Sequence, residues 1–565
     1  QGVLPTTGYP LIDILFGLKT PASGTKPVTL IQGPPGTGKT TVIVEIDEIL
    51  TKGLKFRKGE KPGERIREFY NSRINEDYSQ MMAVLNSVDI NNDNPLFQAG
   101  AKPKISILNV SQSNGAVNNL GERLLLKENV PFVRVGNVEE KISKKLIPNW
   151  EDREKLLKQF GPSGSYVING TNNGLKNDMY LKKYPIFVTF DVVFEDESPK
   201  SSVPETLLIA SMARKKLIKL GDHKQLPSHG LGDKREALVK EEIKNGLKLE
   251  RAPEEIFSLE NRKTYRTSLF EEIYEGDEEN ILDKHFLNIN RRSVWLIAKF
   301  VSELFYDGKL KHRDEGKDQW ETVSEETLKI MPVIFPEEEV YGDEGYKSYR
   351  NYGELDMVLR HIDEILNEPA QDEAQGYRYN PEDLFILSPY KPQVQTIEEF
   401  VTIKAILNDF EGGIVDKDAL AILQAIVRNW AARKRFSDRR VEDFIGNAHS
   451  LAQDTARFQD EIHYMRHTAF KRVFGVQNIR NLGARKISFE EIKSIQFSVA
   501  TVDSIQGQEN KVVIISFVRS NSEKSIGFLN TYDARQRINV AVSRAQERLI
   551  IIWDPTTLLH HPLFQ

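Results

Sequence analysis

The stretch Gly33-Pro34-Pro35-Gly36-Thr37-Gly38-Lys39-Thr40 decides the fold of this chain. It fits the pattern G-x-x-x-x-G-K-[ST] and stands between an apolar run, Val28–Gln32, and a helix-like run, Thr41–Leu50. In that context the pattern predicts a phosphate-binding loop, because glycines let backbone N–H groups close around phosphate oxygens and a helix N-terminus adds positive charge. Lys39 should reach the β- and γ-phosphates, and Thr40 should bind Mg²⁺. A simple Gly/Pro-rich turn is the alternative, and the complete octet disfavours it.

A phosphate-binding loop needs an acidic partner on another strand. The run Asp191–Ser198 supplies one, because its apolar part ends in Asp196-Glu197. We expect Asp196 to hold Mg²⁺ through water and Glu197 to orient or deprotonate the attacking water. Glu195 is unexpected, since an apolar residue usually occupies that position of a strand. The alternative for the whole run is an acidic turn at a strand end.

Composition excludes several classes of protein. The chain has 565 residues, a formal charge of −5 and no cysteine. It therefore has no disulfide scaffold, thiol nucleophile, Cys-ligated zinc site or iron–sulfur cluster. No apolar run approaches the ~18 residues of a membrane span, and the N-terminal residues do not resemble a signal peptide. We expect an intracellular protein, without a choice between nucleus and cytoplasm.

The pattern along the chain predicts an α/β fold with parallel sheets. Apolar, β-rich runs alternate with helix-like stretches in both halves. These runs are Val28–Gln32, Lys104–Val110, Pro131–Val135, Pro185–Val193, Lys216–Leu220, Asp383–Ser388, Phe497–Thr501, Lys511–Phe517 and Arg548–Trp553. Residues 400–492 should form a helical insertion, Glu337–Glu344 an acidic loop and Glu275–Asn280 a hinge. Ile186–Phe190 runs directly into Asp191–Phe194 without a crossover, which favours missing residues over one long strand.

A third apolar strand ends in Gly221-Asp222-His223-Lys224-Gln225-Leu226-Pro227. In this order the three segments resemble motifs I, II and III of superfamily 1 helicases. The Gly-Pro-Pro-Gly loop and the Gln-Leu-Pro ending resemble the Upf/Sen/Dna-type branch, whose members are usually 5′→3′ translocases. The resemblance implies two RecA-like domains with ATP and Mg²⁺ between them. It also implies that Gln225 senses the γ-phosphate.

The second half resembles the remaining motifs. Leu287–Ser293 resembles motif IV, where the family reads Gln-Tyr-Arg, so that Arg292 matches the arginine while Asn290 and Arg291 differ. Thr501–Glu509 matches motif V, which implies that Gly507 and Glu509 face the nucleotide. Arg537–Ala545 matches motif VI, which implies an arginine finger at Arg544 and a second nucleotide-binding arginine at Arg537. For each arginine, a surface ion pair is the alternative.

Further segments resemble the family's contacts to nucleic acid. Ser111–Leu120 is similar to motif Ia, which binds the backbone of a strand, and a capped helix start is the alternative. Ser388–Gln393 is similar to the motif that follows motif IV. The residues implied as strand contacts are Ser111, Ser113, Asn114, Pro389, Tyr390 and Thr501.

Two basic clusters lie outside the resemblance. One is Lys52–Arg73, and the other, in the 400–492 insertion, contains Arg428, Arg433, Lys434, Arg435, Arg439 and Arg440. Both favour a solvated basic face, with an accessory clamp over a strand or a docking arm for another protein as the alternative. Trp430 follows Leu423, Ile426 and Val427 at helical spacing, so we expect it in the core.

These observations predict an ATP-dependent helicase or translocase on single-stranded RNA or DNA. We expect domain 1 at residues 1–276, with an insertion at 52–103, and domain 2 at 277–565, with the insertion at 400–492. We expect a monomer that has no membrane contact and that binds protein partners through the insertions. A nucleotide-dependent clamp within a ribonucleoprotein, without processive unwinding, is the alternative. The charge of −5 does not exclude nucleic acid, because a basic track can be local.

Overall fold

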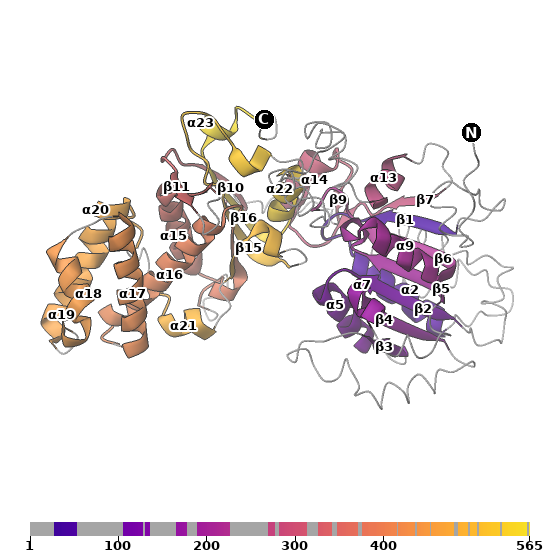
Figure 1. Cartoon of the computed structure of the whole chain (residues 1–565), viewed down its shortest axis with the longest axis horizontal. Helices are drawn as coiled ribbons and strands as arrows, with labels where there is room; N and C mark the ends of the chain where they lie inside the picture. The colour runs from indigo at the N-terminus through magenta and orange to yellow at the C-terminus, as the bar shows by residue number, and fades with distance from the viewer. Residues whose placement is uncertain are drawn as a thin grey trace, which may run out of the picture. The chain divides into compact units, whose positions relative to one another are not determined.

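The computed structural model describes two compact units, each with its own parallel sheet (Figure 1). One unit comprises Gln1–Arg292 and Ser302–Glu315, and the other comprises Ser293–Val301 and Gly316–Gln565. The residues described are 27–52, 105–127, 130–135, 165–177, 189–226, 269–276, 282–313, 326–341, 347–370, 376–414, 416–434, 438–451, 454–479, 484–494, 498–505, 508–530, 534–561 and 564.

The first unit is built on a seven-stranded parallel sheet with the strand order β3-β4-β2-β5-β6-β1-β7. Its strands are β1 (Val28–Gln32), β2 (Ser106–Ser111), β3 (Phe132–Arg134), β4 (Tyr166–Thr171), β5 (Phe190–Asp196), β6 (Ala213–Gly221) and β7 (Asp283–Phe286). Its helices are α2 (Lys39–Lys52), α5 (Asn114–Leu125), α7 (Asn172–Asn177), α9 (Val203–Met212) and α13 (Leu269–Gly276). Two short strands, β8 (Ile289–Asn290) and β9 (Lys311–His312), pair separately.

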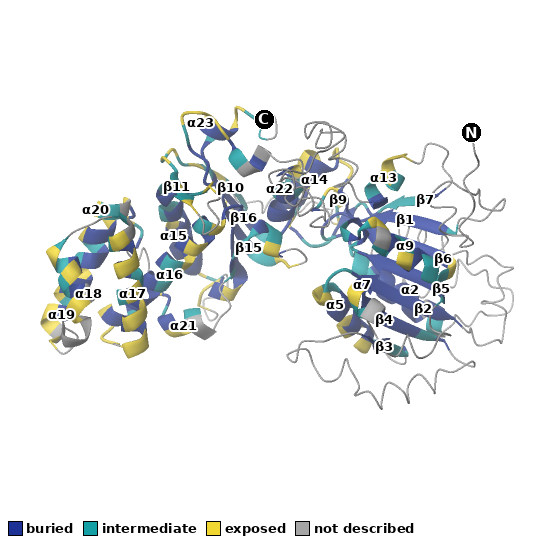
Figure 2. Ribbon diagram, in the orientation of Figure 1, coloured by how far each residue is buried: buried dark blue, intermediate teal, exposed yellow. Residues whose placement is uncertain are grey.

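Both faces of this sheet are covered by helices. Successive strand residues point to opposite faces, and the two apolar clusters of the unit divide accordingly. Ile31 packs in one cluster with residues of α2 and α5, whereas Leu30 packs in the other with residues of α9 and α13. Every residue of β1, β2 and β5 is therefore buried, as Figure 2 shows. This explains why these strands are rich in apolar residues on both faces.

The second unit has a five-stranded parallel sheet with the order β10-β16-β15-β13-β14. Its strands are β10 (Leu328–Pro332), β13 (Leu384–Ser388), β14 (Ser498–Thr501), β15 (Asn510–Ser516) and β16 (Ala545–Trp553). The other elements are α15 (Tyr352–Leu366), α16 (Lys391–Glu411), α17 (Lys417–Lys434), α18 (Arg439–Leu451), α19 (Thr455–Tyr464), α20 (Phe470–Phe474), α21 (Phe489–Ser494), α22 (Ala534–Val542) and α23 (Pro555–Leu558). Helix α14 (Trp295–Phe305) contains the boundary between the units.

The fold class and the helical insertion are confirmed. Both sheets are parallel, and the described residues of 400–492 form helices and connecting loops without a strand, including a π-helical turn at Met465–Ala469. One apolar core joins β13, β15 and β16 to the insertion through α16, and Trp430 lies in it, as expected. The Trp430 ring stacks on Phe400 at a centroid distance of 4.5 Å, and its Nε1 donates to Glu399.

Two expectations about the chain's organisation differ from the structure, and a third is tested in part. Residues 338–341, expected in an acidic loop, form strand β11 (Glu338–Tyr341), which pairs antiparallel with β12 (Lys347–Arg350). The acidic Glu338 is tolerated in this strand because Arg350 and Lys434 form ion pairs with it. The first unit continues past residue 276, since β7 pairs with β1. Phe190 and Asp191–Phe194 belong to one strand, β5, whereas residues 178–188, which include Ile186, lie outside the described residues, so the structure tests only the part of this junction from residue 189 onward.

The unexpected Glu195 has a partner on the neighbouring strand. Glu195 on β5 lies in register with Lys219 on β6, and the two side chains form an ion pair. Both are fully buried, and Thr206 of α9 lies 3.4 Å from the ammonium. The Lys219 ammonium neutralises the Glu195 carboxylate, which offsets much of the free-energy cost of burying that charge. The strand register through Asp196 is therefore settled.

In the part of the chain that the structure describes, no helix combines the length and the apolar character needed to span a membrane. The 52–103 insertion and nearly all of the basic cluster Lys52–Arg73 lie outside the described residues.

Candidate functional site

The phosphate-binding loop lies at the carboxyl end of β1 and leads directly into α2. The loop begins where the N–H of Gly33 donates to the carbonyl of Gly221, at the end of β6, over 2.8 Å. Gly36 and Gly38 have φ angles of +74° and +87°, which glycine adopts without strain. The Lys39 ammonium donates to the carbonyls of Gly33 and Pro34. The lysine therefore bends back over the loop that should surround a phosphate.

Two carboxylates follow β5 at the same edge of the sheet. The Glu197 N–H donates to Oδ1 of Asp196 at 2.9 Å, and Glu197 has a φ of +52°, which is uncommon for a residue with a side chain. Burial and the neighbouring Glu197 charge raise the pKa of Asp196 to about 6, and the nearby Lys39 acts in the opposite direction. Burial lowers the pKa of Lys39, against the charges of Asp222 and Asp196.

The donor set at this edge fits Mg²⁺. Thr40 is the second residue of α2 and Asp196 ends β5, and both offer the hard oxygen atoms that this ion prefers. A buried carboxylate with a raised pKa is a site at which a bound cation would favour the ionised form. Among the described residues no group of three or more His, Cys, Asp and Glu side chains forms a complete metal cage.

Glu197 has two further side-chain neighbours. Its Oε2 lies 2.7 Å from the Lys200 ammonium and 3.4 Å from the Ser113 hydroxyl. Lys200 belongs to a one-turn helix, Ser198–Lys200, and Ser113 caps helix α5 by accepting from the N–H of Ala116. The residue expected as the catalytic base thus contacts a residue expected to bind a strand.

The loop after β6 surrounds Asp222, which is buried. Its Oδ2 accepts a 2.5 Å hydrogen bond from the Tyr306 hydroxyl, and its Oδ1 accepts from the Lys224 N–H and from Gln32. The Gln225 N–H donates to the Asp222 carbonyl, which places Gln225, half-buried, on this loop. Asp222 thereby ties the ends of β1 and β6 to Tyr306.

Arg292 lies beside the phosphate-binding loop, within the first unit. The Asn290 side chain donates to the Pro35 carbonyl at 3.0 Å and accepts from the Arg292 N–H at 3.0 Å. The Arg291 N–H donates to the carbonyl of Gly36, and a Cβ on Gly36 would lie 2.5 Å from the Cβ of Arg292. The sequence placed this segment in the second domain. Its hydrogen bonds to the loop hold it in the first.

The residues at the start of α5 are largely engaged with the protein itself. Asn114 accepts from the buried Arg134 at 2.8 Å. The Ser111 hydroxyl is buried, and the described residues offer it no hydrogen-bond partner. The capped helix start is confirmed by the bond from Ala116 to Ser113, and it leaves the strand-binding expectation open.

The arginines of the second unit donate to its own groups. Arg544 is buried and donates to the carbonyls of Val540 and Gln508, each at 2.9 Å. Arg537 pairs with Asp503 at 3.0 Å. Glu509, the only other predicted nucleotide ligand of this unit to be described, is exposed and accepts from Gln546. Gly507 lies outside the described residues.

The chain was compared with known proteins. Two family models, each described as an AAA domain, match residues 17–153 and residues 265–417 with 475–556. DNA polymerase alpha-associated DNA helicase A is 24% identical over 553 residues in Schizosaccharomyces pombe and 24% over 541 in Saccharomyces cerevisiae. These alignments cover 94% and 93% of this chain and 62% of each relative. DNA-binding protein SMUBP-2 of Rattus norvegicus is 23% identical over 98% of this chain and 46% of its own length.

The chain belongs to the superfamily 1 helicases. It spans about half to two thirds of the length of these three relatives. The second AAA-domain match omits residues 418–474, which hold helices α18 to α20 and nearly all of α17. These insertion helices therefore lie outside both matches.

Of the expected nucleic-acid contacts in the second unit, two are buried. Pro389 and Tyr390 follow β13, and the Tyr390 hydroxyl donates to the carbonyl of Ile526. Thr501 ends β14, half-buried, and donates to the Ser504 hydroxyl. In the insertion, Lys434 and Arg440 are ion-paired, whereas Arg428 and Arg439 are exposed. The side chains of Arg433 and Arg435 lie outside the described residues.

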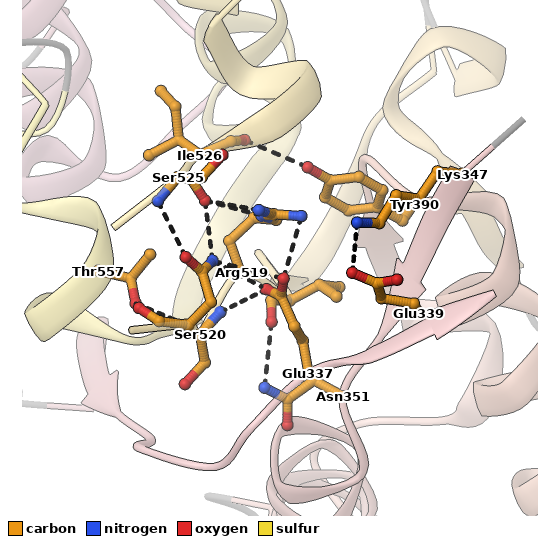
Figure 3. A network of polar contacts seen from close by, with 12 residues as sticks. Glu337, Glu339, Lys347, Asn351, Tyr390, Arg519, Ser520, Ser525, Ile526 and Thr557 are labelled. Carbon is orange, nitrogen blue, oxygen red and sulfur yellow. Dashed lines mark hydrogen bonds and ion pairs between the residues drawn. The ribbon is translucent and has the colours of Figure 1, made fainter. Parts of the chain in front are cut away.

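A polar network next to Tyr390 was not anticipated from the sequence (Figure 3). Arg519, almost fully buried, donates to the Ser525 carbonyl from Nε and Nη2, pairs with Glu337 at 3.1 Å and stacks on Tyr349. In the sequence, Arg519 stands between the apolar Phe517-Val518 and the polar Ser520-Asn521, shortly after strand β15. A buried arginine with a buried carboxylate 182 positions earlier leaves no local sequence signal.

Proposed function

We propose that this chain is the motor of an ATP-dependent helicase that moves along single-stranded RNA or DNA and displaces a paired strand or a bound protein. The main support is the convergence of Lys39, Asp196, Glu197 and Arg292 at the carboxyl ends of β1, β5 and β6. Ligands of open parallel sheets bind at this edge. Each compact unit would act as one RecA-like domain.

In the proposed reaction Lys39 neutralises the β- and γ-phosphates, and Glu197 orients or deprotonates the attacking water. Bound Mg²⁺, held by Thr40 and Asp196, would offset the charge that develops on the phosphate oxygens. Arg292, Arg537 and Arg544 would stabilise charge on the γ-phosphoryl group, and Gln225 would sense it. Arg544 must then exchange its bond to the Gln508 carbonyl for a phosphate oxygen.

The strand would lie along the N-terminus of α5, where Ser111, Ser113 and Asn114 gather, and along the strand ends that carry Pro389, Tyr390 and Thr501. Contacts of hydroxyl and amide groups to phosphates carry no base sequence, so this proposal covers both RNA and DNA. The branch resemblance supports 5′→3′ movement. The chain would act as a monomer, and the exposed Arg428 and Arg439 support protein or strand docking on the insertion.

The test is ATP hydrolysis with and without oligo(U) or oligo(dT), at a stated salt concentration because phosphate contacts are salt-dependent. We expect strand-stimulated turnover that Lys39→Ala and Glu197→Gln both abolish. Normal turnover in either variant would contradict the assignment of the site.

Displacement of a labelled strand from a 5′-tailed duplex distinguishes a helicase from a clamp. We expect displacement that requires ATP. Strand-stimulated hydrolysis without displacement would favour the nucleotide-dependent clamp, a function that the insertion helices outside the AAA-domain matches also fit.

A further inference from the structure

The sheet register brings the α5 cap and the proposed catalytic base together. Ser111 on β2 pairs with Asp196 on the neighbouring strand β5, so the loops that follow these two residues leave the sheet side by side. Ser113 follows Ser111 by two positions and Glu197 follows Asp196 by one. Their side chains therefore meet, with 3.4 Å between the hydroxyl and Oε2. This contact is a consequence of the fold.

Lys200 restrains the same oxygen from the other side. The turn Ser198–Lys200 closes through a bond from the Lys200 N–H to the Glu197 carbonyl, and this geometry places the ammonium 2.7 Å from Oε2. The Lys200 and Glu197 side chains are only 16% and 19% exposed, so solvent screens the pair less than it screens a surface pair. Oε2 thus accepts from two donors, the number that its lone pairs allow.

The two loops are linked at a second point. Gln112 donates to Glu205 at 2.6 Å, and Glu205 also accepts from the N–H and the hydroxyl of Ser202 at the start of α9. A displacement of the β2–α5 loop would therefore be transmitted to the segment that carries Glu197. The left-handed backbone of Glu197 indicates that its position is maintained by its surroundings.

We propose that Lys200 and Ser113 are positioning residues that restrain Glu197, and that a strand phosphate accepting the Ser113 hydroxyl releases one restraint and accelerates ATP hydrolysis. This inference rests on the proposed function. A hydroxyl carries one hydrogen, so Ser113 donates either to Glu197 or to a phosphate oxygen. Binding of a strand at α5 and the restraint on Glu197 are then mutually exclusive, which couples the strand to hydrolysis.

The experiment measures kcat and KM for ATP without a strand and at saturating oligo(U) or oligo(dT). Lys200→Met removes the ion pair, and we expect the strand-free kcat to rise about fivefold with KM unchanged. The stimulation ratio should fall by a similar factor. Lys200→Arg keeps a cation at this position and should restore the low strand-free rate, which a purely structural role would not predict.

Lys215→Met is the matched control. Lys215 forms an ion pair with Asp191 at 3.2 Å, near the end of β5 that is far from Glu197. Lys215→Met therefore removes one positive charge, as Lys200→Met does, but leaves the contacts of Glu197 unchanged. Its two rates should equal those of the wild type. Ser113→Ala should raise the strand-free rate and reduce stimulation, and Ser113→Thr, which keeps the hydroxyl and the helix cap, should restore both.

Two outcomes overturn the inference. One is a strand-free kcat of Lys200→Met that is equal to or lower than that of the wild type, provided that the strand stimulates hydrolysis by the wild type. The other is equal stimulation in Ser113→Ala and the wild type. A wild-type chain without hydrolysis under any condition would instead remove the proposed function, and the inference with it. A lower unfolding temperature of Lys200→Met with a proportional loss of both rates would assign Lys200 a structural role.

Discussion

The side-chain N–H of Asn290 donates to the carbonyl of Pro35 in the phosphate-binding loop, over 3.0 Å. The same amide accepts from the N–H of Arg292, so one buried side chain fixes an arginine beside the loop. Residue 290 is asparagine where the family usually has glutamine, and the asparagine amide makes the bonds to Pro35 and to Arg292. Arg292 is therefore positioned by the unit that carries the loop.

Asn290→Ala should lower kcat for ATP by about 10²-fold with little change in KM, because misplacement of a catalytic group by about 1 Å has an effect of that size. Steady-state ATP hydrolysis measures it. Arg291→Ala is the control, since Arg291 contacts the loop through its backbone N–H, which alanine retains. Equal losses in both variants would contradict a specific role for the Asn290 side chain.

Arg544→Ala should reduce single-turnover hydrolysis by about 10³-fold while ATP affinity stays within a few fold, because a finger acts on charge that develops in the transition state. A fluorescent ATP analogue measures binding separately. Arg544→Lys should lose most hydrolysis too, since an ammonium cannot reproduce the planar guanidinium fork. Loss of ATP binding in a folded variant would argue against the finger role.

Glu354 should make the stability of the second unit depend on pH. Burial raises the pKa of Glu354 to about 8, against the hydrogen bonds from Ser516 and Val518. A carboxyl whose pKa is raised on folding stabilises fully below its ordinary value of 4.5, and this contribution is lost as pH rises through about 8. The free energy of unfolding should fall by a few kcal/mol over this window relative to Glu354→Gln. Parallel pH profiles of the two proteins would contradict it.

Lys404→Met should lower the free energy of unfolding by about 3–5 kcal/mol, because it leaves the buried Asp363 carboxylate without its cation. Lys404 lies 2.7 Å from Asp363 and also donates to the carbonyl of Asn478, which joins α15 and α16 to the end of the insertion. Urea denaturation measures the change. Lys347→Met removes an exposed pair with Glu339 and should leave the midpoint unchanged. Similar shifts in both variants would show that burial is not the cause.

Most strands with two buried faces were predictable from the sequence, and strand β4 (Tyr166–Thr171), which is also buried, was not. The apolar run Val28–Gln32 is β1, residue for residue. In β4 the polar Asn169 interrupts the apolar pattern that would indicate a buried strand. Its side-chain oxygen accepts from Asn109 on β2, and the same Asn109 amide also donates to Asp47 on α2. Such polar residues can be buried because they hydrogen-bond to residues far away in the chain. The spacing of apolar residues in the sequence does not reveal these partners.

The candidate site follows the same rule. The phosphate-binding loop and Asp196-Glu197 were predictable because each is contiguous and ends a strand. The contacts of Glu197 with Lys200 and Ser113 depend on the pairing of β2 with β5, which the sequence does not state. The position of Arg292 depends on the hydrogen bonds of the Asn290 side chain, which the departure of Asn290 from the family's glutamine does not predict.

The ion pair between Glu195 and Lys219 limits how this sequence can diverge. Replacing either residue alone would leave one buried charge at a cost of about 3–5 kcal/mol, whereas replacing both with apolar residues can be neutral. The two positions can therefore change together far more easily than one at a time. A descendant of this chain that carries an ordinary apolar motif II strand should also carry an apolar residue at the position of Lys219.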